Sequence, residues 1–113
     1  MSLLQTIRGK APLDPASPAP VADAARRLCA ALLAHNRLRA EDVVAARFTS
    51  PDSPLDAVRE AGWAGIPIFF TRTAADAVEV EAHVRLKKRR KLRPLELGPA
   101  AADESPAHER RPA

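Results

Sequence analysis

The sequence predicts an α+β domain, in which a four- to five-stranded mixed sheet carries one long and one short helix on one face. Residues Val78 to Leu86 alternate between apolar and polar side chains, a pattern typical of a strand with one buried face. Residues Val21 to Asn36 repeat apolar side chains at three- and four-residue spacing, the period of a helix that buries one stripe. Strand-like and helix-like segments are interspersed along the chain, which favours a two-layer domain with one sheet and one layer of helices.

The first third of the chain predicts a strand, a loop and the long helix. Leu3 to Lys10 alternates and contains Gly9 near its end, which indicates a first strand. Ala11 to Pro20 contains four prolines and is expected to connect without joining a ladder or a helix. The helix of residues 21 to 36 follows. In the first strand the two faces carry Leu3, Gln5 and Ile7 on one side and Leu4, Thr6 and Arg8 on the other.

The middle of the chain predicts two more strands around a short helix. Val43 to Ser50 opens with a β-branched pair and ends in a proline-containing turn, as a strand does. Leu55 to Ala61 predicts a short helix, which Pro54 would begin and Gly62 would end. Ile66 to Thr71 is a compact apolar run, and we expect a strand that is partly buried on both faces.

The fourth predicted strand, Val78 to Leu86, places four chemically active side chains on one face. Lys87 to Lys91 breaks its alternation and predicts a basic hairpin or loop, and Leu92 to Leu97 predicts a short edge strand that Gly98 ends. Because one long helix can cover only one face of such a sheet, a second subunit is expected to close the other. The side chains that share the polar face are Glu79, Glu81, His83 and Arg85.

Length and composition predict one domain over residues 1–98 and a disordered tail over 99–113, where small, charged and proline residues cannot bury enough apolar area. Eighteen Lys and Arg against fourteen Asp and Glu give a net charge of +4, which favours an anionic partner of unspecified class. The single cysteine, Cys29, excludes an internal disulfide and a cysteine-based zinc site. Neither a signal peptide nor a membrane-length apolar run is visible, so we expect a cytoplasmic protein with no membrane association.

Six short motifs follow one another over residues 4 to 97. They are Ile7-Arg8-Gly9, Ala40 to Val44, Thr49 to Asp52, Ala57 to Glu60, Gly62-Trp63 with Ile66 to Ile68, and His83-Val84 and Leu86 with Leu92 to Pro94. Together they resemble the motifs of the monofunctional chorismate mutases that form trimers. The resemblance covers nearly all of the predicted domain and implies a trimeric pseudo-α/β-barrel with active sites at subunit interfaces. It also implies rearrangement of chorismate to prephenate, a pericyclic reaction that needs neither cofactor nor metal.

An enzyme of this kind must hold a compact dianion and place a cation beside the ether oxygen, where negative charge grows as the bond breaks. Arginine suits both tasks because its guanidinium stays charged and can hold a carboxylate with two hydrogen bonds. By the resemblance, Arg8 matches the family's first-strand active-site arginine, Arg59 matches an arginine at the mouth of the site, and Leu92 and Arg93 match residues that approach the substrate.

The chain also departs from the family pattern. Phe70 stands where the family has a small residue or cysteine that touches the substrate, and Thr73 stands where it has a glutamate that binds the ring hydroxyl. About fifteen residues are missing between Thr73 and His83, including the arginine beside the ether oxygen. With or without that gap, alignment brings Arg85 into the site, and Glu81 or Glu79 could replace the absent glutamate.

Two alternatives to an active chorismate mutase stay open on the sequence. The departures favour a degenerate member that binds a chorismate-like dianion, or a partner enzyme, without turnover. The basic run Lys87 to Arg93 favours nucleic-acid binding, but it lacks the interleaved aromatic residues on which bases stack. We interpret Lys87 to Lys91 as a solvated loop that steers anions and His83 as a hydrogen-bonded structural residue.

Overall fold

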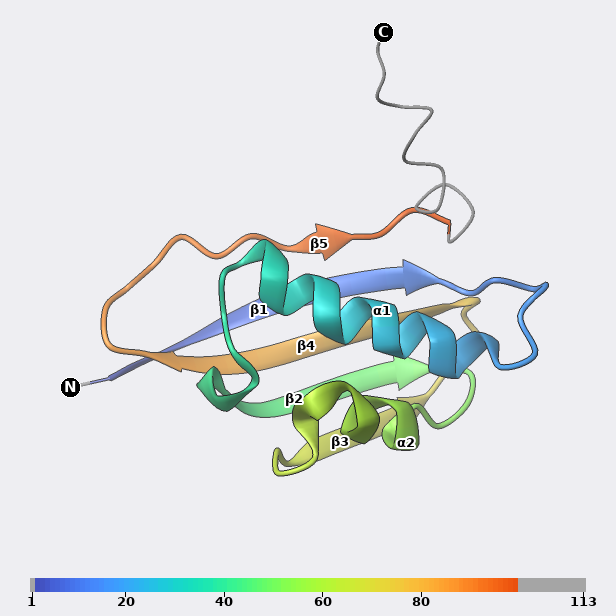
Figure 1. Cartoon of the computed structure of the whole chain (residues 1–113), viewed down its shortest axis with the longest axis horizontal. Coiled ribbons are helices and arrows are strands. Elements are labelled where there is room, and N and C mark those ends of the chain that lie inside the picture. The colour runs from blue at the N-terminus through green and yellow to red at the C-terminus, as the bar shows by residue number, and fades with distance from the viewer. Residues whose placement is uncertain (1, 100–113) are drawn as a thin grey trace, which may run out of the picture.

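A computed structural model describes residues 2–99 of the protein. It contains a five-stranded mixed sheet with its helices on one face, which confirms the predicted fold class (Figure 1). The predicted tail, apart from Pro99, lies outside the described residues. The elements are β1 (Leu3–Pro12), α1 (Pro20–His35), η1 (Ala40–Asp42), β2 (Val43–Ser50), α2 (Leu55–Val58), η2 (Arg59–Trp63), β3 (Ile68–Arg72), β4 (Ala77–Leu86) and β5 (Leu95–Glu96).

The strands lie in the order β3-β2-β4-β1-β5, with β4 at the centre. Strand β4 runs antiparallel to both β1 and β2, whereas β3 is parallel to β2 and β5 is parallel to β1. The register of β1 and β4 is unbroken over ten residue pairs, from Leu3 opposite Leu86 to Pro12 opposite Ala77. This long central pairing holds the side chains of both strands in fixed rows across the sheet.

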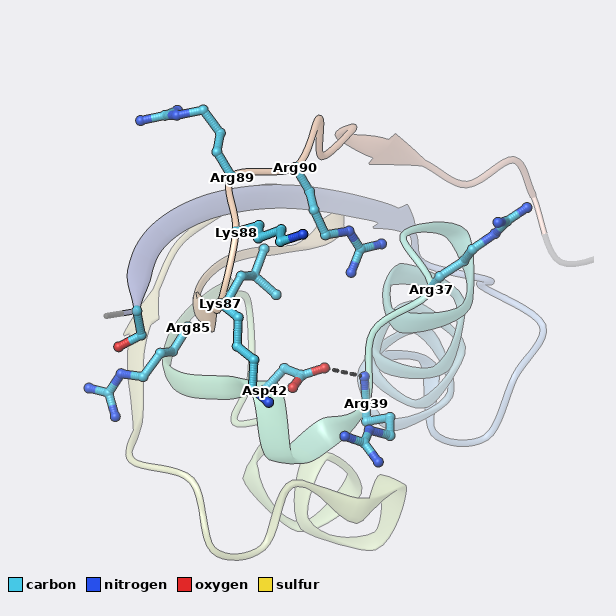
Figure 2. Close-up of a pocket in the computed structure, with 10 residues that line it drawn as sticks. Arg37, Arg39, Asp42, Arg85, Lys87, Lys88, Arg89 and Arg90 are labelled. Atoms are coloured by element: carbon cyan, nitrogen blue, oxygen red, sulfur yellow. Dashed lines mark hydrogen bonds between the residues drawn. The ribbon is translucent and has the colours of Figure 1, made fainter.

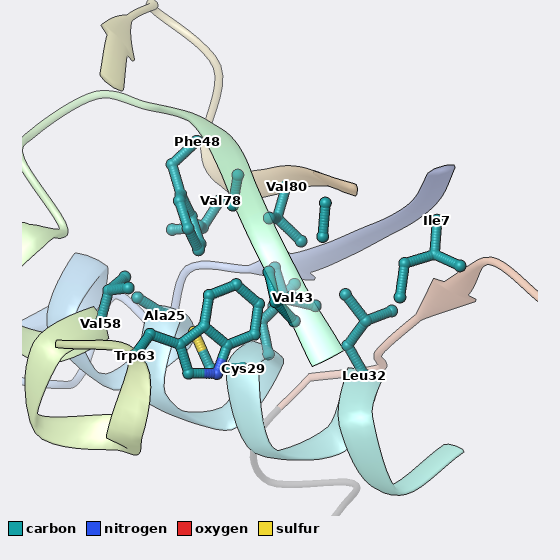
Figure 3. Close-up of a cluster of buried hydrophobic side chains, with 14 of the residues drawn as sticks. Ile7, Ala25, Cys29, Leu32, Val43, Phe48, Val58, Trp63, Val78 and Val80 are labelled. Atoms are coloured by element: carbon teal, nitrogen blue, oxygen red, sulfur yellow. The ribbon is translucent and has the colours of Figure 1, made fainter. Parts of the chain in front are cut away.

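The hydrophobic core lies between the sheet and the helices (Figure 3). Leu28 and Leu32 of α1 are fully buried against the sheet, as is Phe48 of β2. Trp63 covers the edge of this core, and its ring meets Phe48 edge to face with centroids 5.9 Å apart. Burying each such side chain stabilises the fold by roughly 1.5–3 kcal/mol, so this layer is the main source of stability.

Strand β1 is longer than predicted, because Ala11 and Pro12 continue its pairing with β4. Pro12 is the last residue of the strand, where the missing N–H is tolerated. Gly9, expected near the end of the strand, instead lies inside it and faces α1. A Cβ atom there would stand 2.9 Å from Cδ1 of Leu28, so glycine allows the helix to pack closely on the strand.

The short helix and the strand after it also differ from prediction. The helix α2 continues into the wider turn η2, in which Gly62 adopts a positive φ of 102° that favours glycine. Strand β3 begins at Ile68 and is an edge strand with one open face, since the side chain of Phe69 is 61% exposed. The prediction that this strand is partly buried on both faces was therefore wrong for the open face, where Phe69 and Thr71 are exposed. An apolar run by itself does not distinguish an edge strand from a central one.

The segment after β4 forms no hairpin with it. Residues 87 to 94 cross to the other side of β1, where β5 adds two residues parallel to Gly9 and Lys10. The predicted edge strand of residues 92 to 97 is thus correct in place but shorter in extent. Among residues 2–99, no helix is long and apolar enough to cross a membrane.

Candidate functional site

The candidate site lies on the open face of the sheet, the face opposite the helices. Alternation along β1 and β4 sends Ile7 and Val80 into the core and leaves Arg8 and Glu81 on this open face. The pairing register then places Arg8 directly opposite Glu81 and Arg47 opposite Glu81 on its other side. A row of side chains therefore crosses the sheet in the order Phe69, Arg47, Glu81 and Arg8.

Glu81 lies between the two arginines of this row. Its Oε2 atom accepts a hydrogen bond from Nη2 of Arg8 at 2.6 Å, and the Arg8 side chain is 72% exposed. Within the described part of the chain, Arg47 has no ion pair or hydrogen-bond partner for its side chain. The row thus offers one guanidinium in an exposed ion pair and a second that is available to an anion.

Two shallow depressions meet at Arg8. One, of about 250 Å³, lies over β2 and β4 and includes Arg47, Thr49 and Glu79. The other, of about 500 Å³, lies toward β5 and includes Lys10 and Glu96. The arrangement can bind a carboxylate through the arginines, and it can accept a hydrogen bond from a hydroxyl group through Glu81.

Of the residues predicted for the site, the structure brings Arg8 and Glu81 together. Arg85 shares their face but lies opposite Leu4, four residues beyond Glu81 along β4, or about 13 Å at the rise of a strand. The strand is continuous from Ala77, so the position directly opposite Arg8 is occupied by Glu81 and not by Arg85. Figure 2 shows the Arg85 guanidinium pointing away from the neighbouring basic loop into solvent.

Three other predicted residues lie apart from Arg8 within one chain. Arg59 follows α2 in the helical layer, where its Nη1 atom contacts Oδ1 of Asp56 at 3.0 Å. Phe70 is the cross-strand neighbour of Phe48 and therefore points to the helix-covered face. Thr73 follows β3, and its amide donates a hydrogen bond to the carbonyl of Ser50 at 3.0 Å.

The predicted C-terminal pair, Leu92 and Arg93, lies in the segment that leads into β5. Leu92 packs against the core. The backbone N–H of Arg93 donates to Oδ1 of Asn36 at 2.7 Å, and its carbonyl accepts a hydrogen bond from Nδ2 of Asn36 at 3.0 Å. The Arg93 side chain is exposed. His83 is hydrogen-bonded as expected, since its Nδ1 atom lies 3.0 Å from Oγ1 of Thr6.

Sequence reasoning missed Arg47 and Lys10. Alternation along residues 43 to 50 does separate Arg47 and Thr49 from Phe48, so the signal for the correct face was present. The residue opposite Arg47, however, depends on the register of β2 and β4, which is interrupted by an irregularity between Val43 and Ala45. Among the described residues, no cluster of His, Cys, Asp or Glu could hold a metal ion.

The fold and this face define an α+β domain with one helical layer and an open, charged sheet. No protein-family model matches the sequence, and no curated protein matches it. Among solved structures, the chain is similar to a chorismate mutase from Clostridium thermocellum, with a TM-score of 0.73 and 19% sequence identity over 87% of this chain and 98% of that chain. The domain therefore has a chorismate-mutase-like fold, as the sequence motifs predicted.

Proposed function

We propose that the protein is a chorismate mutase, which rearranges chorismate to prephenate without a cofactor and so supplies aromatic amino acid biosynthesis in the cytoplasm. The observation that carries this proposal is the row of Arg47, Glu81 and Arg8 at the centre of the open face of a chorismate-mutase-like sheet. The reaction needs no nucleophile or proton transfer. The row supplies fixed cations and a hydrogen-bond acceptor, the groups that this chemistry requires.

Substrate binding exchanges one carboxylate for another at Arg8. In the Arg8–Glu81 ion pair the Arg8 side chain is 72% exposed and the Glu81 side chain 30% exposed, and a pair that is open to solvent contributes only about 0–1 kcal/mol. A substrate carboxylate can therefore displace Glu81 from Arg8 at little cost, while Arg47 contacts the second carboxylate or the ether oxygen. Released from Arg8, Glu81 can accept a hydrogen bond from the ring hydroxyl, the role that the family gives to a glutamate.

A homotrimer completes the site in this proposal. Among residues 2–99, the exposed large hydrophobic side chains are Leu4 and Phe69, and both lie on the open face. Such exposed apolar groups on an uncovered sheet favour association with other subunits. At the interface, the neighbouring chain would bring up Arg59, Thr73 and Arg93, predicted substrate-binding residues that one chain holds away from Arg8, and Arg85 would act as the second catalytic cation. The predicted substrate contacts of Phe70 and Leu92 are left out of this arrangement, because both side chains face the core side of their own chain.

The test is a chorismate assay with purified protein, in which chorismate is consumed and prephenate appears. Arg8→Ala and Arg85→Ala are each expected to lower kcat/KM by about 10²- to 10³-fold, the loss typical of removing one group that stabilises developing charge. Arg26→Ala, in the helical layer, is the matched control and should keep the full rate. Wild-type protein that leaves chorismate unchanged at micromolar enzyme concentration would refute the enzymatic proposal.

A second candidate is a family member that binds a chorismate-like dianion, or a partner enzyme, without turnover. It is favoured by the 2.6 Å contact of Glu81 with Arg8, because a carboxylate there neutralises a cation that the reaction requires. Calorimetry with a bicyclic transition-state mimic separates the two candidates. Binding of the mimic by protein that does not turn over chorismate selects the second, and Glu81→Gln should then tighten that binding.

A further inference from the structure

A large basic cavity lies at the end of the sheet where β4 finishes, apart from the row around Arg8. Its volume is about 880 Å³, and three segments far apart in the sequence surround it, the first of which is Ser2 near the N-terminus. Arg37 and Arg39 follow α1, and Lys87 to Arg90 form the loop after β4 (Figure 2). We propose that this cavity, called the basic cavity below, binds a compact oligophosphate anion, either free or as the triphosphate group of a nucleotide.

The charge of the basic cavity exceeds that of the whole chain. Seven cationic side chains and one carboxylate, that of Asp42, line it and leave a net charge of +6, whereas the whole sequence carries +4. Seven of the eighteen Lys and Arg residues of the chain therefore gather around one concavity. In Figure 2, Lys88 and Arg90 extend toward its centre, whereas the guanidinium groups of Arg37, Arg85 and Arg89 point outward from its rim. A concave surface of one sign focuses the field and attracts multiply charged anions.

Few carboxylates in the fold compensate these cations. The Asp42 carboxylate accepts a hydrogen bond from the backbone N–H of Arg39 at 2.9 Å, and the Arg39 guanidinium lies 3.2 Å from Glu41. Within residues 2–99, the side chains of Arg37, Lys88 and Arg89 have no hydrogen-bond or ion-pair partner. Mutual repulsion among uncompensated cations destabilises the folded state, and a bound polyanion would relieve it.

The basic loop is held in place before any ligand arrives. The side-chain amide of Gln5, on β1, makes two hydrogen bonds with the backbone of Arg90. The Gln5 Nε2 atom donates to the Arg90 carbonyl at 2.6 Å, and the Gln5 Oε1 atom accepts from the Arg90 N–H at 3.0 Å. The Arg90 guanidinium donates to the carbonyl of Asn36 at the end of α1. The two walls of the cavity are thus joined by hydrogen bonds, so less entropy is lost when an anion binds.

The lining selects a compact anion over a nucleic-acid strand. Figure 2 shows Lys88 and Arg90 reaching from the loop toward the space in front of Arg37 and Arg39, around a volume suited to a small ligand. None of the described residues that line the cavity is aromatic, although binding of single strands relies on base stacking. A dicarboxylate such as chorismate carries only two charges, whereas a tripolyphosphate approaches the charge of the lining.

Calorimetry with inorganic tripolyphosphate at physiological ionic strength, without divalent cations, tests this proposal on the full chain. We expect binding of one anion per chain and a rise in Tm. Lys88→Gln, in the loop, and Arg37→Asn, in the facing wall, should each weaken binding several-fold, and together at least tenfold. Asparagine is chosen because it tolerates the positive φ of 53° at residue 37. Lys91→Gln is the matched control, because Lys91 belongs to the same loop but does not line the cavity.

Each result decides the proposal independently of chorismate turnover. Equal affinity for tripolyphosphate and ATP supports a site that recognises phosphate alone, and tighter binding of ATP supports one that also contacts the nucleoside. Absence of tripolyphosphate binding overturns the proposal. It is also overturned if Lys91→Gln weakens binding as much as Lys88→Gln, or if a single-stranded RNA binds and tripolyphosphate does not displace it.

Discussion

Removal of the Asn36 side chain is expected to destabilise the protein by about 2–4 kcal/mol. Asn36 is only 5% exposed and makes three side-chain hydrogen bonds, one to the carbonyl of Leu32 at 3.2 Å and two to the backbone of Arg93 at 3.0 and 2.7 Å. Each contributes about 1 kcal/mol net, and leaving the partly buried Arg93 groups unsatisfied adds to the loss. Asn36→Ala therefore removes two of the hydrogen bonds that join the end of α1 to the C-terminal segment, and it leaves the bond from the Arg90 guanidinium to the carbonyl of residue 36 in place.

Urea unfolding of Asn36→Ala and wild type measures the free-energy difference, and amide hydrogen exchange at Arg93 locates it. Exchange at Arg93 should become faster in the variant, while amides of β4 follow only the global change in stability. His35→Ala is the control, since this neighbouring side chain is exposed and its loss should cost less than about 0.5 kcal/mol. A loss below 0.5 kcal/mol for Asn36→Ala, with Arg93 still protected, would refute the reasoning and mean that water replaces the amide.

Two further predictions concern the core. Gly9→Ala should destabilise the protein by about 1–3 kcal/mol, because the new methyl group meets Leu28 at 2.9 Å in a filled core, whereas Gly65→Ala, with nothing within 4 Å, should be neutral or stabilising by denaturant unfolding. Equal stability of the two variants would show that Leu28 moves aside freely. Burial raises the pKa of the Cys29 thiol from 9.0 to about 12, so above pH 9 the unfolded chain loses a proton that the native state keeps. The free energy of unfolding should then fall between pH 9 and 12 by up to about 1.4 kcal/mol per pH unit more than in Cys29→Ala, and parallel pH profiles for the two proteins would contradict this.

The periodicity of apolar side chains correctly predicted the elements that have one buried face and one exposed face. The long helix, Pro20–His35, and the strand Val43–Ser50 fall within one residue of their expected bounds, since each repeats a pattern that has one buried face. The same alternation correctly divided Val78 to Leu86 into a core face and a polar face. The motifs that resemble chorismate mutases also predicted the fold that the structural comparison shows.

The candidate site depends on pairings that a local pattern does not contain. Alternation assigns Arg8, Arg47 and Glu81 each to one face of its own strand, but only the register of three strands makes them neighbours. The same register leaves Arg85 at the far end of β4 and turns Phe70 toward the helices. Two Arg residues after α1 likewise meet the loop of residues 87 to 90 only because the chain crosses back beside β1.

The sequence by itself determined the fold class, the long helix and the buried faces of β1, β2 and β4, because these follow from side chains close together along the chain. Only the tertiary structure decided which charges stand opposite one another, why Gly9 lies inside a strand, and how the basic residues surround a cavity. Those contacts join residues up to 85 positions apart, as Gln5 and Arg90 are, and their geometry depends on strand register and helix packing.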